Sequence, residues 1–327
     1  MYLVTGGAGF IGSNVVAALS DRNDEVVVCD WLGQDERWRN LAKHEISELI
    51  EPETLLAWLH RKGDRLRAVV HMGAISATTE TDVDLIASRN IRATLDLMEW
   101  CAVAQVPFIY ASSAATYGDG AQGFDDTFGR KSLAKLRPLN AYGWSKHVID
   151  RRIARMLEAG EKLPPQWVGL KFFNVYGPNE YHKGTMRSVI ARNFSDVQRG
   201  VPLRLFRSYN AEYTDGGQKR DFIYVRDCVD VMLWFLENSG ISGLFNLGTG
   251  QARTWMDLGN ALYGALGRAP KLEIIDMPAE LRLKYQYYTQ AKMDRLRDIG
   301  YDRPFTSLES GIGDYVKQYL LKEDPYR

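Results

Sequence analysis

Short apolar runs alternate along the chain with longer stretches whose apolar positions recur at helical spacing. The apolar runs span residues 2–4, 25–29, 68–71, 107–111, 168–172 and 244–247. Runs this short and this apolar are typical of strands buried on both faces of a parallel sheet, with helices between them. The alternation therefore predicts an α/β fold, namely a Rossmann-type doubly wound parallel sheet with right-handed crossovers.

After residue 174 the chain leaves this alternation, returns to it and leaves it again. We expect a helix over about 179–199, a strand at 203–206, a polar loop at 208–219 and a last helix at 306–321. This order predicts a smaller, discontinuous substrate-binding domain beside the sheet. The predicted boundaries place residues 1–173 with 222–248 in the larger domain and residues 174–221 with 249–327 in the smaller one.

Three glycines follow the first apolar run at three-residue steps. They are Gly6, Gly9 and Gly12, and a helical pattern over residues 13–19 comes next. A strand, a glycine turn and a helix form the context of a dinucleotide-binding turn. The missing side chains let the backbone approach a pyrophosphate, and the helix start offers it free N–H groups. The alternative interpretation is an ordinary turn between a strand and a helix.

An acidic residue ends the second predicted strand. Asp30 lies 18 residues beyond Gly12, where a carboxylate can bind the adenosine ribose of NAD. Arg37 and Arg39 follow in a polar stretch, where a guanidinium could instead meet the 2′-phosphate of NADP. The alternative for Arg37 is a solvated loop charge.

Hydroxyl side chains follow the strand at 107–111, and a Tyr–Lys pair comes later. Ser113 stands at the carboxyl end of that strand, where parallel sheets bind ligands. Tyr142 and Lys146 are four residues apart, so they share one helix face. We expect the ammonium to lower the phenol pKa from about 10 and to make Tyr142 a usable base. A second pair, Tyr288 and Lys292, follows no such strand end, and we interpret it as chance.

The strand at 68–71 is followed by the small residues 73–76, which leave room for the flat face of a cofactor. Asn90 lies in the helix that comes after them. His71, within the strand, is interpreted as a core histidine. The stretch 119–138 is long, polar and glycine-rich, and it predicts a loop or lid with one helical turn.

Composition excludes several classes of function. The chain has 327 residues with 41 basic and 41 acidic side chains, so no basic field favours nucleic acid. No apolar stretch approaches the roughly 20 residues of a membrane helix. The three cysteines are far apart, without metal-ligand spacing, and predict buried thiols of a reducing compartment. With no leader pattern at the N-terminus, we expect a cytoplasmic protein that binds no metal and no membrane.

In combination these motifs resemble a known family. The glycine turn, Ser113, the Tyr142–Lys146 pair and the stretches 173–178 and 220–225 are similar to extended short-chain dehydrogenases/reductases that act on nucleotide sugars. Further motifs resemble the branch of that family that epimerises ADP-linked glycero-manno-heptose for the lipopolysaccharide core; they lie at 110–118, 182–184, 233–238 and 285–286. The resemblance covers nearly the whole chain, although the loops at 119–138 and 208–219 look longer than usual.

The resemblance implies inversion at C6″ of the heptose by transient oxidation and re-reduction with bound NADP, with NAD as the alternative cofactor. Tyr142 and Lys183 are the implied acid/bases, Ser113 binds the reacting oxygen, and Lys146 assists Tyr142 and binds the cofactor ribose. The alternative for Lys183 is a lysine that binds the substrate diphosphate. The implied cofactor contacts are Gly6, Gly9, Phe10, Ile11, Gly12, Asp30, Trp31, Arg37, Met72, Gly73, Ala74, Ile75, Ser76, Asn90, Lys146, Val175 and Lys183. The implied substrate contacts are Ser113, Asn174, Thr185, Arg192, Phe206, Arg220 and Tyr285.

Two alternatives stay open beside this interpretation, and the partner is in each case a small molecule. One is another nucleotide-sugar epimerase or dehydratase, although a dehydratase usually carries Asp-Glu where this chain has Ala114 and Ala115. The other is a non-catalytic cofactor sensor, which typically lacks the Tyr or the Lys that are both present here. We also expect a homo-oligomer.

Overall fold

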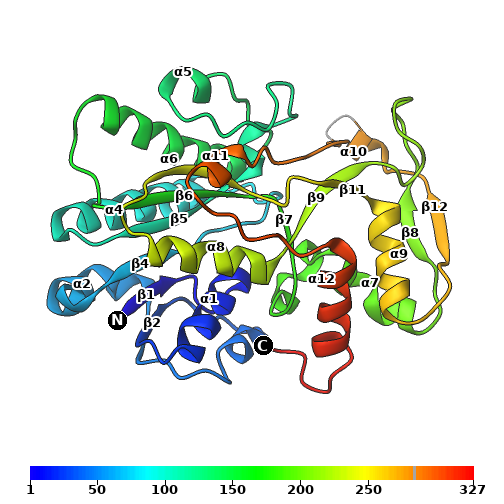
Figure 1. Ribbon diagram of the computed structural model, residues 1–327, viewed down its shortest axis with the longest axis horizontal. Coiled ribbons are helices and arrows are strands. Elements are labelled where there is room, and N and C mark those ends of the chain that lie inside the picture. The colour runs from blue at the N-terminus through cyan, green and yellow to red at the C-terminus, as the bar shows by residue number, and fades with distance from the viewer. Residues whose placement is uncertain (283–284) are drawn as a thin grey trace.

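A seven-stranded parallel sheet forms the centre of the protein, of which the computed structural model describes residues 1–282 and 285–327 (Figure 1). Its strand order is β10-β6-β5-β4-β1-β2-β3. The bounds are β1 Tyr2–Thr5, β2 Val26–Cys29, β3 Glu48–Ile50, β4 Ala68–His71, β5 Phe108–Ser113, β6 Trp167–Phe172 and β10 Gly243–Leu247. The predicted Rossmann-type fold is confirmed, and the strands predicted from the six apolar runs all lie in this sheet. Only β3 was missed, because it is three residues long and mostly not buried.

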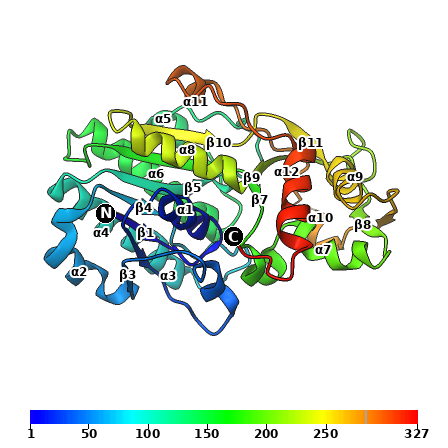
Figure 2. The same cartoon turned by 60° about the horizontal axis from the view of Figure 1, so that its bottom comes forward.

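Helices cover both faces of this sheet (Figures 1 and 2). Helices α1 and α8 pack against each other, whereas α4 and α6 both pack on β5. The bounds are α1 Phe10–Asp21, α2 Leu55–Lys62, α3 Val83–Ile86, α4 Ala93–Ala104, α5 Arg130–Leu133, α6 Ala141–Glu158, α8 Val225–Glu237 and α11 Asp294–Asp298, with a π-helical turn at Ala87–Arg92. The short helix α5 is the single turn predicted within the loop at 119–138.

Two small sheets and the helices α7, α9 and α12 surround a second apolar cluster, to the right in Figure 1. One sheet has the order β11-β9-β7, and the other pairs β12 with β8. The bounds are β7 Asn174–Tyr176, β8 Leu203–Phe206, β9 Lys219–Tyr224, β11 Ala252–Thr254, β12 Leu272–Ile275, α7 Val189–Gln198, α9 Trp255–Ala265, α10 Ala279–Arg282 and α12 Leu308–Tyr315. These elements come from separate stretches of the chain, as a discontinuous domain requires. The domain boundaries themselves stay a prediction.

The helix predicted over 179–199 is wrong in its first half. The chain forms a short 3-10 turn at Tyr181–Met186, which is interrupted at Gly184 (φ 53°), and α7 begins only at Val189. Ser188 caps α7 through its side chain, and the carboxylate of Glu180 accepts a hydrogen bond from that same hydroxyl (2.7 Å). The positive φ of Gly184 interrupts the 3-10 turn, and the N-cap Ser188 starts α7.

The last predicted helix, over 306–321, is confirmed as a continuous helical stretch from Leu308 to Leu320. Helix α12 begins at Leu308 after the capping residue Ser307, and a π-helical turn at Val316–Leu320 follows it.

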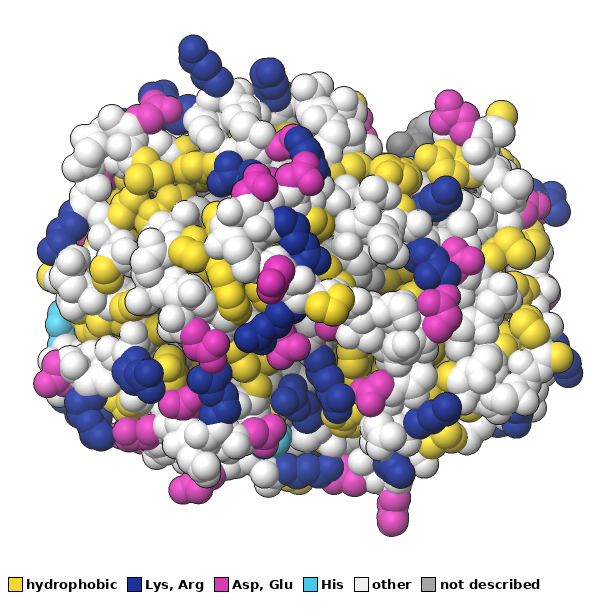
Figure 3. All heavy atoms as spheres, in the orientation of Figure 1, with side chains coloured by type: hydrophobic (Ala, Val, Ile, Leu, Met, Phe, Trp, Pro, Cys, Tyr) yellow, Lys and Arg dark blue, Asp and Glu magenta, His cyan; other side chains and the backbone are white. Residues whose placement is uncertain are grey.

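Charges of both signs are interspersed over the face shown in Figure 3. Among the described residues, no helix combines the length and the apolarity that crossing a membrane requires. The three cysteines are free and buried, as predicted.

Candidate active site

The glycine turn brings three segments of backbone into close contact. Gly6 adopts φ +64°, and a Cβ there would lie 2.5 Å from the backbone nitrogen of Gly73. A Cβ on Gly12 would overlap the carbonyl oxygen of Gly6. Gly9 precedes α1 without any side chain that caps the helix, so the first N–H groups of α1 remain available to a ligand. The turn therefore has the shape of a pyrophosphate cradle.

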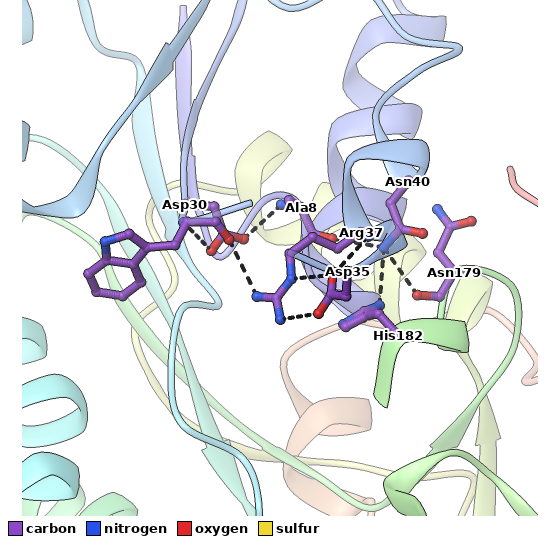
Figure 4. A network of polar contacts seen from close by, with 8 residues as sticks. Ala8, Asp30, Asp35, Arg37, Asn40, Asn179 and His182 are labelled. Atoms are coloured by element: carbon purple, nitrogen blue, oxygen red, sulfur yellow. Dashed lines mark hydrogen bonds and ion pairs between the residues drawn. The ribbon is translucent and has the colours of Figure 1, made fainter. Parts of the chain in front are cut away.

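Asp30 stands beside this turn, as predicted (Figure 4). Its carboxylate accepts hydrogen bonds from the N–H groups of Ala8 (2.9 Å) and Trp31 (2.8 Å). Burial raises the pKa of Asp30, and these two hydrogen bonds oppose the rise. Arg37 donates to both carboxylate oxygens of Asp35, at 2.9 and 2.8 Å. Arg37 is thus paired with Asp35, so it is neither a solvated loop charge nor a cation that is free to bind phosphate. This ion pair was not predicted from the sequence.

The indole of Trp31 lies exposed next to Asp30 and is held from two sides. Its Nε1 donates to the Glu53 carboxylate at 2.9 Å, and the guanidinium of Arg89 lies 4.0 Å from the ring centroid. An exposed aromatic face in a fixed orientation can stack on a planar base. Neither Glu53 nor Arg89 was predicted, since both are distant in sequence.

Asn90 connects the loop after β4 to the helix that carries the Tyr–Lys pair. Its Oδ1 accepts from the N–H of Ile75 (2.8 Å), and its Nδ2 donates to the Ile75 carbonyl (3.0 Å) and to the hydroxyl of Ser145 (3.1 Å). Ser145 in turn donates to the carbonyl of Tyr142 at 2.7 Å. Asn90 thereby fixes the loop after β4 relative to α6. The other loop residues predicted there are Met72, Gly73, Ala74 and Ser76.

His71 is a core histidine, as interpreted from the sequence. One ring nitrogen lies 2.6 Å from the hydroxyl of Thr5, and the other lies 2.8 Å from the hydroxyl of Thr94. Burial lowers the pKa of His71 to about 3, so the ring is neutral.

Ser113, Tyr142 and Lys146 come together at the carboxyl end of β5 and the start of α6. Tyr142 is half-buried beside Ser113, and Lys146 is almost fully buried. Burial raises the pKa of Tyr142, and the contact with Ser113 opposes the rise. The predicted lowering of this pKa by Lys146 is therefore wrong for the chain by itself. Burial also lowers the pKa of Lys146, to about 8, which weakens the ammonium as a source of charge.

A fully buried ion pair anchors α6 to the sheet one turn after Lys146. The Asp150 carboxylate lies 2.8 Å from the Lys171 ammonium, and their side chains are 0% and 1% exposed. Ser112 and Tyr110 on β5 donate to the same carboxylate, at 2.9 and 3.1 Å. Sequence reasoning missed this cluster, although a lysine inside an apolar strand was a visible signal.

Lys183 lies on the 3-10 turn before α7. Its ammonium is 5.3 Å from the centroid of the Phe10 ring, at the start of α1. Burial lowers the pKa of Lys183, and the nearby Glu180 carboxylate opposes this. The sequence leaves two causes open for a lowered pKa of Lys183, namely burial or a nearby cation such as Arg187, His182 or Lys146, and the cause is burial.

Arg220, Phe206 and Tyr285, which are all predicted substrate contacts, form one cluster. The Arg220 guanidinium is buried, at 5.3 Å from the ring centroid of Tyr285 and 5.8 Å from that of Trp255. Phe206 meets Tyr285 edge to face at 6.3 Å. Within residues 1–282 and 285–327, Arg220 has no carboxylate partner, and burial lowers its pKa. A buried cation of this kind favours an anionic ligand.

The remaining predicted substrate residues flank the Lys183 turn. Arg192 on α7 donates to the carbonyl of Thr185 (3.2 Å). Asn174 begins β7 with an exposed side chain, and Val175 follows it, half-buried. The rival pair of Tyr288 and Lys292 does not come together as a site: Lys292 pairs with Asp125 at 2.8 Å, and the Tyr288 hydroxyl donates to Gln290 at 3.0 Å.

The model of the NAD dependent epimerase/dehydratase family matches residues 2–248. The chain belongs to this family. It is 49% identical, over the whole of both chains, to a protein of Nitratidesulfovibrio vulgaris (strain DP4) named ADP-L-glycero-D-manno-heptose-6-epimerase.

Two solved structures of epimerases are similar to this family member over nearly its whole length. The Helicobacter pylori ADP-L-glycero-D-manno-heptose-6-epimerase superposes with a TM-score of 0.77 at 29% identity, covering 97% of this chain and 95% of the other. The Thermus thermophilus UDP-glucose 4-epimerase, solved with NAD, gives 0.72 at 27% identity, covering 96% and 97%.

The residues present fit the dinucleotide that gives the family its name. A Cβ would fill the cradle at Gly6 or Gly12, Asp30 stands at the end of β2, and Lys146 is buried close to Tyr142. By contrast, no three His, Cys, Asp or Glu side chains of the described ranges gather as metal ligands would.

Proposed function

We propose that the protein is a cytoplasmic, NADP-dependent nucleotide-sugar epimerase that inverts C6″ of ADP-glycero-manno-heptose, a precursor of the lipopolysaccharide core. The observation that carries this proposal is the full-length 49% identity to a relative with that named activity. The site geometry supports it independently, since Arg220 suits a diphosphate and the Ser113–Tyr142–Lys146 group suits alcohol oxidation.

When bound, the cofactor supplies a reversible hydride acceptor beside the sugar carbon. Tyr142 removes and returns the proton of the reacting hydroxyl on one face. Ser113 donates a hydrogen bond to the same oxygen and keeps it within reach of the phenol. The Lys146 ammonium stabilises the phenolate when Tyr142 is deprotonated.

Lys183 acts as the acid/base on the opposite face of the reacting sugar carbon. A group that handles protons at neutral pH needs a pKa below that of a free lysine, about 10.4, and burial lowers the pKa of Lys183 in that direction. The Glu180 carboxylate nearby keeps the protonated form accessible as well. The competing role is a diphosphate ligand, and Arg220 already provides a buried cation for that purpose.

For the cofactor, Arg37 supports NADP and Asp30 supports NAD. To bind a 2′-phosphate, Arg37 would have to give up its two charge-assisted hydrogen bonds to Asp35 and form two to the phosphate instead. NAD would need no exchange, since the Asp30 carboxylate could receive the ribose hydroxyls. We favour NADP and propose in addition a homo-oligomer, which light scattering on the purified protein tests.

The test of this proposal is direct conversion of the named sugar nucleotide. Purified protein with cofactor is incubated with one C6″ epimer of ADP-glycero-manno-heptose, and the configuration at C6″ is followed by NMR, with UDP-glucose as the control substrate. We expect both heptose epimers to appear and UDP-glucose to remain unchanged. Conversion of UDP-glucose alone would assign the chain to another epimerase of the family.

A further inference from the structure

The last residues of the chain run back across the molecule to the cofactor side. After α12 and its π-helical turn, the tail leaves the smaller sheets, and the C-terminal end lies beside α1 in both ribbon views (Figures 1 and 2). The side chain of Tyr326 is only 8% exposed there. A buried aromatic residue this close to the end of the chain indicates a docked segment.

One side of the tail contacts the segment that follows β2. The Lys43 ammonium donates to the carbonyl of Tyr326 at 2.6 Å and pairs with the Asp324 carboxylate at 3.0 Å. The Arg39 guanidinium lies 4.6 Å from the centroid of the Tyr326 ring. Both basic residues belong to the stretch next to Arg37, which borders the cofactor site.

The other side of the tail contacts the segment that carries Lys183. The Tyr181 hydroxyl donates to the carbonyl of Pro325 at 2.8 Å, and its ring meets that of Tyr326 edge to face at 5.1 Å. The N–H of Arg327 donates to the Oδ1 of Asn179 at 2.9 Å. Residues 324–327 therefore lie between two segments that are far apart in sequence.

Asn179 is the point where these contacts converge. It is fully buried and adopts φ +73°, a conformation that is uncommon outside glycine and persists only when its surroundings hold it. Its Nδ2 donates to the hydroxyl of Ser13 on α1 at 3.0 Å. Its carbonyl accepts from Asn40 at 3.3 Å, and the same Asn40 amide donates to the carbonyl of Ala8 at 2.8 Å (Figure 4).

The Lys183 turn is also tied to α7 and α12, because the buried carboxylate of Glu180 accepts hydrogen bonds from the hydroxyls of Ser188 (2.7 Å) and Tyr315 (3.1 Å). It is a short 3-10 turn, broken by the non-helical Gly184, and residues 184–186 are exposed. The Lys183 ammonium lies 5.3 Å from the centroid of the Phe10 ring on α1. The position of Lys183 thus depends on how residues 179–182 are held.

We infer that residues 324–327 are a positioning clamp that fixes the Lys183 segment against the glycine turn, through Asn179 and Tyr181. The clamp acts through Lys183 and contributes no group to the reaction itself. Its effect on turnover rests on the proposed function, whereas its effect on the segment does not.

The first test measures the segment directly, by amide hydrogen exchange of residues 179–186 in the full-length protein. Tyr326→Ala removes the ring that packs on Tyr181, whereas Tyr326→Phe keeps the ring and loses only a hydroxyl that has no hydrogen-bond partner among the described residues. We expect faster exchange of this segment in Tyr326→Ala, wild-type exchange in Tyr326→Phe, and no change within α6 in either. Wild-type exchange of the segment in a folded Tyr326→Ala would overturn the inference.

If Tyr326→Ala does not fold, Tyr181→Phe is the deciding variant, because it removes the hydrogen bond to the Pro325 carbonyl and keeps the ring. One net hydrogen bond of about 1 kcal/mol predicts roughly fivefold faster exchange of the segment. Unchanged exchange in Tyr181→Phe would then overturn the clamp.

The second test measures the consequence for turnover. Misplacement of a reacting group by a fraction of an ångström to about 1 Å predicts a fall in kcat of about tenfold or more in Tyr326→Ala. The dissociation constant of the cofactor and the substrate KM should stay close to wild type, and Tyr326→Phe should restore kcat. Wild-type kcat together with faster exchange would refute the positioning role. A wild-type protein that fails to epimerise the heptose would refute the proposed function instead, and the exchange result would still decide whether the tail holds the segment.

Discussion

The two acid/base candidates stand on very different supports. Tyr142 lies at the start of α6, an 18-residue helix capped by Asn140 and fastened to the sheet by the buried pair of Asp150 and Lys171. Lys183 lies on a broken 3-10 turn that side-chain amides and the C-terminal tail hold in place. The side of the site that carries Tyr142 is therefore fixed by regular structure close in sequence. The side that carries Lys183 is fixed by contacts between residues far apart in the chain.

The largest expected effect comes from breaking the rigid support. Lys171→Met leaves the Asp150 carboxylate buried without its partner, and we expect a loss of about 3–5 kcal/mol in the free energy of unfolding. Chemical denaturation of the two proteins measures this loss. The matched control is Arg152→Ala on the same helix, whose ion pair with Glu161 is exposed and should contribute at most about 1 kcal/mol. Equal effects of the two substitutions would show that the buried pair does not anchor α6.

The next effect concerns the group that α6 presents. Tyr142→Phe removes only the ionisable hydroxyl, and we expect kcat to fall by about 10² or more, the range typical of acid–base groups. Cofactor binding should survive because the ring remains, which a fluorescence titration checks. Near-normal turnover would remove Tyr142 from the chemistry.

A smaller effect is expected at Arg220, which lies on the regular strand β9. Arg220→Ala should weaken the binding of ADP-heptose by about 1.5–3 kcal/mol, the value of a charged hydrogen bond, measured by calorimetry. Arg220→Lys keeps the charge without the planar fork, and we expect an intermediate affinity. Unchanged affinity in Arg220→Ala would separate this cluster from the diphosphate.

The smallest effect is expected on the irregular side of the site, at Arg37 in the 3-10 turn Glu36–Asn40. Arg37→Ala should lower the preference for NADP over NAD by about tenfold, equivalent to about 1.4 kcal/mol. Asp35→Asn removes the charge that now pairs with Arg37 and should shift the preference toward NADP. Binding titrations with both cofactors measure the ratio, and an unchanged ratio in both variants would favour NAD as the cofactor.

This contrast also explains what the sequence could predict. The glycine turn, Asp30 and the Tyr142–Lys146 pair were visible because each depends on spacing within a few residues of a strand or helix end. The ties of Asn40 to Asn179 and of Arg327 to Asn179 join residues 139 and 148 positions apart, and no local pattern records them. For the same reason the turn at 181–186 was predicted as helix. The predicted direction of the Tyr142 pKa shift was wrong because burial, which raises this pKa, is a property of the folded chain.

Lys183→Arg distinguishes the proposed role of Lys183 as the second acid/base from the competing role as a diphosphate ligand. Arginine keeps a cation that binds phosphate but stays protonated, so it cannot act as a base near neutral pH. The measurement pairs the substrate dissociation constant by calorimetry with the C6″ epimer ratio over time at saturating substrate. The account predicts near wild-type affinity with epimerisation lost, in Lys183→Arg and in Lys183→Ala alike. Wild-type epimerisation in Lys183→Arg, with affinity weakened only in Lys183→Ala, would contradict it.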